Sequence, residues 1–166
     1  MNFDPAQICR ILNEEGVEYV ILGGFAAVIL GSPLPTEDID VLPSRESTNL
    51  ERLAQALSRM RAQIRTSGDP VPAPLDAGFL LQMPHILNLV TDFGILDLTF
   101  TPAGPHGGYA EWNLGATTIE IADQLSVRVA SLDDIIDSKR AANRTKDLSA
   151  LPYLESLRDA LGAVDD

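Results

Sequence analysis

An apolar run that ends in two glycines constrains the fold of this chain more than any other feature of its sequence. Val17–Leu22 (VEYVIL) is rich in β-forming residues, which predicts a strand buried on both faces. Gly23 and Gly24 follow directly, and FAAVIL then has the composition of a short apolar helix that ends at Gly31. The N-terminal N–H groups of such a helix could bind an anion, and glycine would let a phosphate approach the backbone closely. In isolation, the two glycines also fit a plain tight turn.

Two aspartates lie on the next predicted strand. Pro33 and Pro35 predict an extended linker that leads into a strand over Asp38–Leu42. Asp38 and Asp40 alternate with the period of a strand, so their side chains point to one face. Like charges at this spacing repel, and Mg²⁺ is commonly held by one or two carboxylates together with substrate phosphates. The pair therefore indicates a site for Mg²⁺ or Mn²⁺, although a polar strand end on a solvated sheet face is an equally simple origin for it.

A third carboxylate lies in a later strand. HILNLVTDFGILDLTF predicts two strands joined by a tight turn near Asp92–Gly94. Asp97 lies in the middle of the second strand, where β-propensity disfavours an acid. An exposed position on an antiparallel edge would explain it without any function. If the strand instead neighbours Asp38–Leu42, the three acids could hold two metal ions of the kind that serve phosphoryl or nucleotidyl transfer.

A basic cluster lies near the end of the sequence. Lys139 and Arg140 stand near the end of one predicted helix, and Arg144, Lys146 and Asp147 stand at the start of the next. The helix dipole favours cations near a helix C-terminus, so capping and surface charge could explain the cluster. Alternatively, Lys139, and with it Arg144 and Lys146, faces a triphosphate or an acceptor substrate. Asp147 would then orient one of these cations by a charge-assisted hydrogen bond.

The remaining pattern alternates helices and strands. We expect helices over 4–16, 46–63 and 131–142, a hairpin over 117–130, loops over 66–84 and 104–116, and a last helical region that Pro152 could break. The fold class is therefore α/β (α+β), with a mixed β-sheet flanked by helices and a helical C-terminus. We expect a single domain over 1–166, with a core over about 1–105 and an accessory hairpin and C-terminal helices over about 106–166.

Composition limits the binding partners and the cellular location that we expect for this chain. The net charge of −12 argues against broad, non-specific nucleic-acid binding and fits a site that holds divalent cations. No apolar run has the roughly 20 residues needed to cross a bilayer, and the N-terminus lacks the pattern of a signal peptide. Cys9 is the only cysteine and has apolar neighbours, so we expect it to fill the core in a reducing cytoplasm. One cysteine and two isolated histidines provide no zinc-ligand spacing.

The stretch GG…GSPLPTEDIDV, followed by LDLTF, resembles the nucleotidyltransferase superfamily of polymerase-β-like enzymes. With DDIIDSKRAANRTKDLSAL, the resemblance is finer and points to the AbiEii-type nucleotidyltransferases, which are toxin components of toxin–antitoxin pairs. It extends over most of residues 17–157. It implies that Gly23 and Gly24 hold nucleotide phosphates, that Asp38 and Asp40 bind Mg²⁺, and that Asp97 is a third acid that binds metal or helps to deprotonate the acceptor hydroxyl.

The same resemblance places Lys139 among the catalytic residues, and it places Lys139, Arg144, Lys146 and Asp147 at the nucleotide. The chain departs from the pattern at Leu34, where relatives often carry a basic residue in this linker. One phosphate contact would therefore be lost, which leaves room for a weakened or altered activity.

The expected activity is Mg²⁺-dependent transfer of a nucleoside monophosphate from a nucleoside triphosphate to a hydroxyl of an RNA, such as a tRNA 3′ end, or of a protein. An antitoxin protein is the partner that the finer resemblance implies. One alternative is a catalytically silent binding module with the same fold, and a weaker one is a metal-dependent phosphohydrolase. The sequence does not identify the acceptor, the base preference or the oligomeric state.

Overall fold

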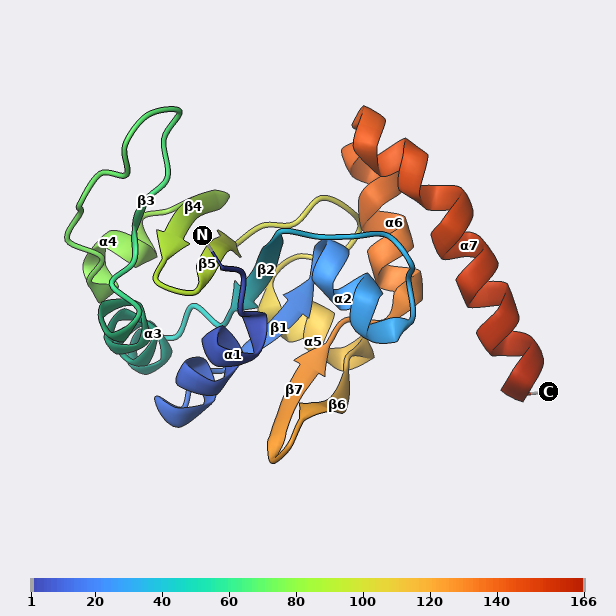
Figure 1. Cartoon of the computed structure of the whole chain (residues 1–166), viewed down its shortest axis with the longest axis horizontal. Coiled ribbons are helices and arrows are strands. Elements are labelled where there is room, and N and C mark those ends of the chain that lie inside the picture. Colours follow the sequence, from blue (N-terminus) through green and yellow to red (C-terminus); the bar gives the residue numbers. More distant parts are fainter. Residues whose placement is uncertain (1, 166) are drawn as a thin grey trace.

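The computed structural model describes residues 2–165, and its strands form a single seven-stranded sheet (Figure 1). The order of the strands across the sheet is β3-β4-β5-β2-β1-β7-β6. The strands are β1 (Tyr19–Leu22), β2 (Asp38–Pro43), β3 (Gln63–Ile64), β4 (Ile86–Thr91), β5 (Gly94–Thr99), β6 (Thr117–Ala122) and β7 (Leu125–Val129).

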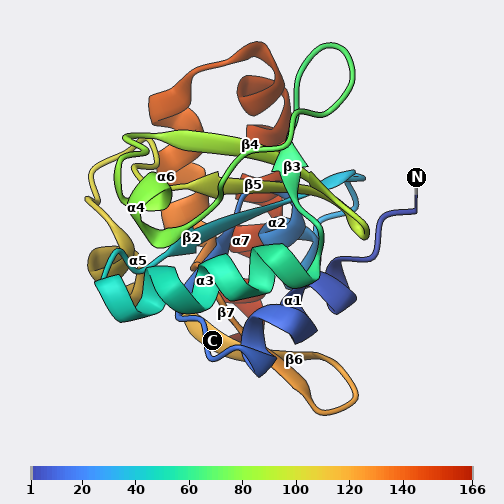
Figure 2. The same ribbon diagram turned by 90° about the vertical axis from the view of Figure 1, so that its left-hand side faces the viewer.

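Seven helices accompany the sheet in the described part of the chain. They are α1 (Pro5–Glu14), α2 (Gly23–Leu30), α3 (Ser47–Arg59), α4 (Ala77–Leu81), α5 (Tyr109–Gly115), α6 (Leu132–Ala142) and α7 (Thr145–Asp165). Helices α1 and α3 lie side by side beneath the sheet in Figure 2. In Figure 1, α6 and α7 lie at the right-hand end of the molecule, and α2 lies between them and the central strands. None of the helices in residues 2–165 combines the length and the apolar composition that crossing a membrane requires.

The sheet is mixed, as predicted. The pairs β1–β2, β4–β5, β3–β4 and β6–β7 are antiparallel, whereas β2–β5 and β1–β7 are parallel. The β4–β5 and β6–β7 hairpins have short turns, which suit antiparallel neighbours. The β2–β5 pair needs a crossover, to which α3 contributes.

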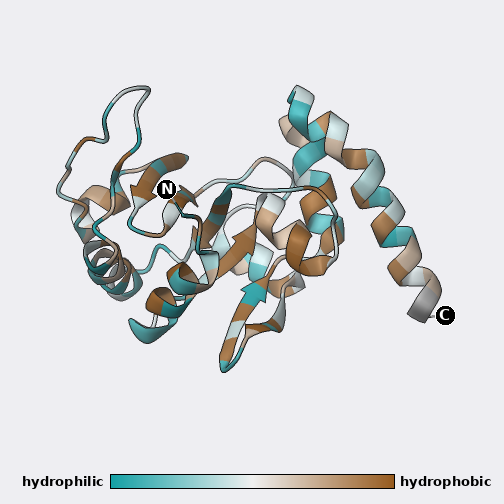
Figure 3. Cartoon of the chain, in the orientation of Figure 1, coloured by the Kyte–Doolittle hydropathy of each residue, from teal (hydrophilic) through white to brown (hydrophobic). Residues whose placement is uncertain are grey.

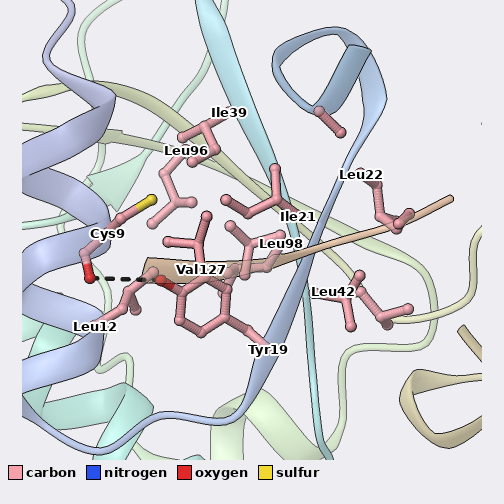
Figure 4. Close-up of a cluster of buried hydrophobic side chains, with 14 of the residues drawn as sticks. Cys9, Leu12, Tyr19, Ile21, Leu22, Ile39, Leu42, Leu96, Leu98 and Val127 are labelled. Atoms are coloured by element: carbon pink, nitrogen blue, oxygen red, sulfur yellow. Dashed lines mark hydrogen bonds between the residues drawn. The ribbon is translucent and has the colours of Figure 1, made fainter. Parts of the chain in front are cut away.

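A large part of the core lies between one face of the sheet and helices α1 and α3. Figure 4 shows Cys9 and Leu12 of α1 close to Ile39, Leu96 and Val127 of the strands. All five side chains are 3% exposed or less. Burial raises the pKa of the Cys9 thiol to about 12, so this cysteine is neutral and fills the core as expected. Figure 3 shows the same division, with the central strands largely hydrophobic and α7 of mixed character along its length.

Three predicted elements differ in the structure. Residues 104–116 are not all loop, because Tyr109–Gly115 form α5 and bury Trp112 under the sheet end. The helix predicted over 46–63 ends at Arg59, since Arg61 adopts a positive φ of 51° and redirects the chain into β3. The predicted 66–84 loop contains the short helix α4.

Pro152 does not break the last helix. Helix α7 runs continuously from Thr145 through Pro152, although proline removes a backbone hydrogen bond at that turn. Leu151 and Leu154, on either side of it, are buried, so packing holds both halves of the helix in place. Leu148 and Leu161, which share the same leucine pattern, are exposed.

Candidate metal and phosphate site

The pairing of β2 with β5 brings the aspartates together. The two strands are parallel neighbours, and the register places Asp40 directly opposite Asp97. Ile39 and Leu96 point into the core, so the aspartates on the alternate positions face the other side of the sheet. Asp97 is therefore not on an antiparallel edge, because β5 lies between β4 and β2 in the interior of the sheet.

The three carboxylates form one cluster. Asp38, Asp40 and Asp97 each offer an oxygen, and these oxygens lie within 4.8 Å of one another. Oxygen donors of this kind are the ligands that Mg²⁺ and Mn²⁺ prefer, and two carboxylates plus substrate oxygens suffice to hold Mg²⁺. The donor set therefore fits a divalent metal site.

The cluster is electrostatically costly without a cation. Burial and the neighbouring charge of Asp38 raise the pKa of Asp40 to about 6. Burial, the charges of Asp40 and Asp38, and a hydrogen bond with Asp38 raise the pKa of Asp97 to about 7. Both carboxyls bind protons more readily than an isolated aspartate does, and a divalent cation would relieve the same repulsion.

Gly23 is required by the geometry of the cluster. Its φ is +68°, and a Cβ added there would lie 2.0 Å from Oδ2 of Asp40. Gly24 is the next residue, where an added Cβ would lie 3.3 Å from Oγ1 of Thr36. Helix α2 begins at Gly23, directly beside Asp40, so its free N-terminal N–H groups and the carboxylates border the same space.

Thr36 orients the first aspartate, a role that sequence reasoning missed. Its Oγ1 lies 3.0 Å from the backbone oxygen of Asp38 and 3.2 Å from Oδ1 of the same residue. The hydroxyl can donate to either oxygen, so it fixes both the linker end and the Asp38 side chain. A threonine two residues before an aspartate is the local signal for this contact.

The basic cluster is organised by Asp147. Asn143, with a φ of 55°, ends α6 in the left-handed conformation, and α7 begins two residues later. The Asp147 carboxylate is fully buried at this corner. It accepts hydrogen bonds from Nε of Arg144 at 2.6 Å and from the Arg144 backbone N–H at 3.2 Å, and it pairs with Nζ of Lys139 at 3.6 Å.

The charges at this corner act on each other and on the aspartate cluster. Burial acts to raise the pKa of Asp147, but the Arg144 hydrogen bonds and the charges of Arg144 and Lys139 outweigh it and lower that pKa. Lys146, Lys139 and Arg144 each act to lower the pKa of Asp40. The predicted cations therefore lie around the carboxylates.

Arg140 belongs to a different surface. Its guanidinium pairs with Asp137 on α6 and with Glu155 on α7, so it ties the two helices together. Sequence reasoning grouped it with Arg144 and Lys146, whereas the structure separates it from them.

Arg65 is a residue of the site that sequence reasoning did not single out. It follows β3, and its Nη2 lies 3.5 Å from Oδ1 of Asp97, the carboxylate whose pKa it acts to lower. No local motif marks it, because the contact reaches across β4 and depends on the strand order. Its side chain is 41% exposed.

The fold of the chain is similar to that of several nucleotidyltransferases of known structure. The lincosamide antibiotic adenylyltransferase LnuA, solved with lincomycin bound, has a TM-score of 0.62 and 16% identity over 95% of this chain and 99% of its own. ANT(2'')-Ia, in complex with adenylyl-2''-tobramycin, has a TM-score of 0.53 and 17% identity over 96% of this chain and 95% of its own.

An antigenic nucleotidyltransferase-like protein from Paracoccidioides brasiliensis has a TM-score of 0.53 and 16% identity, over 92% of this chain and 72% of its own. No protein-family model and no curated protein sequence matches the chain. At these identities the likeness concerns the fold: the chain has a nucleotidyltransferase-like fold, as the sequence predicted.

Proposed function

We propose that this chain is a metal-dependent nucleotidyltransferase that moves a nucleoside monophosphate from a nucleoside triphosphate to a hydroxyl. The observation that carries the proposal is the meeting of Asp38, Asp40 and Asp97 beside the glycine start of α2. A structural sheet end would not need three mutually repelling acids at this position. The nucleotidyltransferase-like fold supports the proposal.

The proposed roles follow from the geometry. Asp38, Asp40 and Asp97 would hold Mg²⁺ or Mn²⁺, which supplies charge neutralisation to the reacting phosphate when bound. Gly23 and Gly24 present backbone N–H groups to the triphosphate without side-chain obstruction. Lys139 and Arg144, fixed by Asp147, together with the exposed Lys146, would bind the triphosphate and stabilise the charge that develops as pyrophosphate leaves.

The transfer itself exchanges one bond for another. The acceptor oxygen bonds to the α-phosphorus, the bond from that phosphorus to the bridging oxygen breaks, and pyrophosphate leaves. The acceptor proton passes to Asp97 or to solvent. Positioning of the two substrates provides much of the rate.

The finer assignment rests on the AbiEii-type resemblance of the glycine, T-x-D-x-D and late helix motifs. It makes a tRNA 3′ end or a protein hydroxyl the candidate acceptor, an antitoxin the candidate protein partner and the cytoplasm the candidate location. Antibiotics are a further acceptor class to assay, because LnuA is named a lincosamide antibiotic adenylyltransferase and ANT(2'')-Ia was solved with adenylyl-2''-tobramycin.

The test is transfer of label from each α-labelled nucleoside triphosphate, with Mg²⁺, to tRNA, to protein and to lincomycin or tobramycin. Asp40→Asn is the variant at the site, and Asp69→Asn, at an exposed position outside the helices and strands, is the matched control. We expect nucleotide binding and transfer by the wild type and Asp69→Asn, and a loss of transfer of at least a hundredfold in Asp40→Asn. Nucleotide binding without transfer would favour the silent binding module, and release of free monophosphate alone would favour the phosphohydrolase.

A further inference from the structure

One row of side chains crosses the sheet from the carboxylates to its edge. Asp40 lies opposite Asp97, and Asp97 lies opposite Asn88. The backbone N–H of Arg65 donates to the backbone oxygen of Asn88 at 3.0 Å. Residues directly opposite one another on neighbouring strands face the same side of a sheet. Arg65 and Asn88 therefore share the face that carries the aspartates, and both are exposed there.

The cations flank the carboxylates from two sides. Lys139, Arg144 and Lys146 come from the α6–α7 corner and act on Asp40. Arg65 comes from the opposite edge of the sheet and contacts Asp97. Of the arginines on the β3–β5 side, Arg65 is the one that contacts the carboxylate cluster. Arg61 pairs with Asp92 instead, and Arg45 donates to backbone oxygens of residues 81–84.

The geometry of phosphoryl transfer indicates which side of the carboxylates faces the triphosphate and which faces the acceptor. In phosphoryl transfer, the attacking and leaving oxygens lie roughly in line with the phosphorus. If the triphosphate lies on the α2 start and the α6–α7 cations, the acceptor must approach from the other side, over β5 and β4. Arg65 then stands beside the attacking hydroxyl, and it cannot contact the leaving pyrophosphate.

We propose that Arg65 binds an anionic group, a phosphate or a carboxylate, that the acceptor carries close to its attacking hydroxyl. This inference rests on the nucleotidyltransferase function proposed above. The guanidinium has five N–H donors. Within the described residues its side chain makes one polar contact, the long one of 3.5 Å to Asp97. A planar fork with free donors is suited to an oxyanion.

A single cation also limits the size of the recognised anion. A long nucleic acid would need several cations along its backbone, and Arg65 provides one. The expected acceptor is therefore a small phosphorylated or carboxylated alcohol, or the terminal nucleotide of a nucleic acid held at one phosphate.

The experiment begins with nucleotide binding. Calorimetric titration with Mg²⁺ and each α,β-methylene nucleoside triphosphate should show binding by the wild type and at least tenfold weaker binding by Asp40→Asn. Failure of this step would refute the proposed function, and the inference about Arg65 would fall with it.

The second step titrates the nucleotide-saturated protein with glycerol 3-phosphate, glycerate and bulk tRNA, with glycerol as the uncharged control. At least one anionic probe should bind the wild type and should bind Arg65→Gln at least tenfold more weakly. Arg65→Lys should lie between the two, because lysine keeps the charge but lacks the planar fork. Arg61→Gln, which alters another exposed arginine, should match the wild type. The probe that binds most tightly identifies the source of the anion.

Two results of the second step would overturn the inference while the proposed function stands. One is that no anionic probe binds the nucleotide-saturated wild type. The other is that Arg65→Gln binds every probe as tightly as the wild type, which would leave Arg65 only as a counter-ion to Asp97.

Discussion

At the scale of single residues, Gly23 shows how closely the backbone must approach the acids. An alanine there would need a left-handed φ of +68° and would place its Cβ 2.0 Å from Asp40 Oδ2. We expect Gly23→Ala to lower the free energy of unfolding by about 2 kcal/mol and to weaken nucleotide binding at least tenfold. Urea unfolding and nucleotide titration measure the two effects. Gly162→Ala, where an added Cβ meets nothing within 4 Å, is the control, and equal behaviour of the two variants would contradict the prediction.

The charge of the Asp97 carboxyl changes near neutral pH in the metal-free protein. Because its pKa of about 7 lies above that of an unfolded aspartate, the native state binds more protons, and the metal-free protein loses stability as the pH rises from about 4 to 7. We expect Asp97→Asn, with EDTA present, to unfold at a free energy on the order of 2 kcal/mol above that of the wild type at pH 7.5, with the gap closing near pH 4. Urea denaturation across this range is the measurement. A difference that stays constant with pH would show that the charge of Asp97 is not its origin.

At the scale of elements, the corner between α6 and α7 depends on one buried acid. Asp147→Asn keeps the shape but removes the charge that holds Lys139 and Arg144. We therefore expect nucleotide affinity to fall about tenfold and stability to fall by about 2 kcal/mol, the value of a hydrogen bond to a charged group. Calorimetry and thermal unfolding provide the two readouts. Asp133→Asn, on the exposed first turn of α6, should change neither by a comparable amount. Unaltered nucleotide affinity in Asp147→Asn would remove the corner from the binding site.

Comparison of the predicted and observed helices and strands shows which elements local sequence patterns were sufficient to predict. Helix α1, strand β2, the β4–β5 and β6–β7 hairpins and the Ser131 cap of α6 follow from local residues, since capping and turn chemistry act over three or four positions. Helix α5 was missed because GPHGGYAEWNLGA opens with glycine and proline, and the burial of Trp112 that supports the helix comes from distant strands. Pro152 was given too much weight, because packing on both sides of it overrides the local preference.

At the scale of the whole molecule, a metal ion should act as a stabiliser of the folded chain. The three carboxylates meet only when β2 and β5 pair, so the unfolded chain has no comparable site. A ligand that binds only the folded state raises stability by RT ln(1 + [L]/Kd). We expect Mg²⁺ at 100 times its Kd to add about 2.7 kcal/mol, measured by thermal unfolding. Asp38→Asn and Asp40→Asn should lose most of this gain, whereas Asp69→Asn should keep it, and a gain in all of them would indicate non-specific ion effects.

The sequence by itself determined the fold class, the strand that precedes Gly23, the shared face of Asp38 and Asp40 and the composition of the late basic cluster. These depend on periodicity, propensity and capping, which act between near neighbours. Only the tertiary structure decided that Asp97 stands opposite Asp40, that Arg140 points to α7 instead of the acids, and that Arg65 reaches Asp97. Strand order and register place residues that are far apart in the chain side by side, and no local pattern encodes that order.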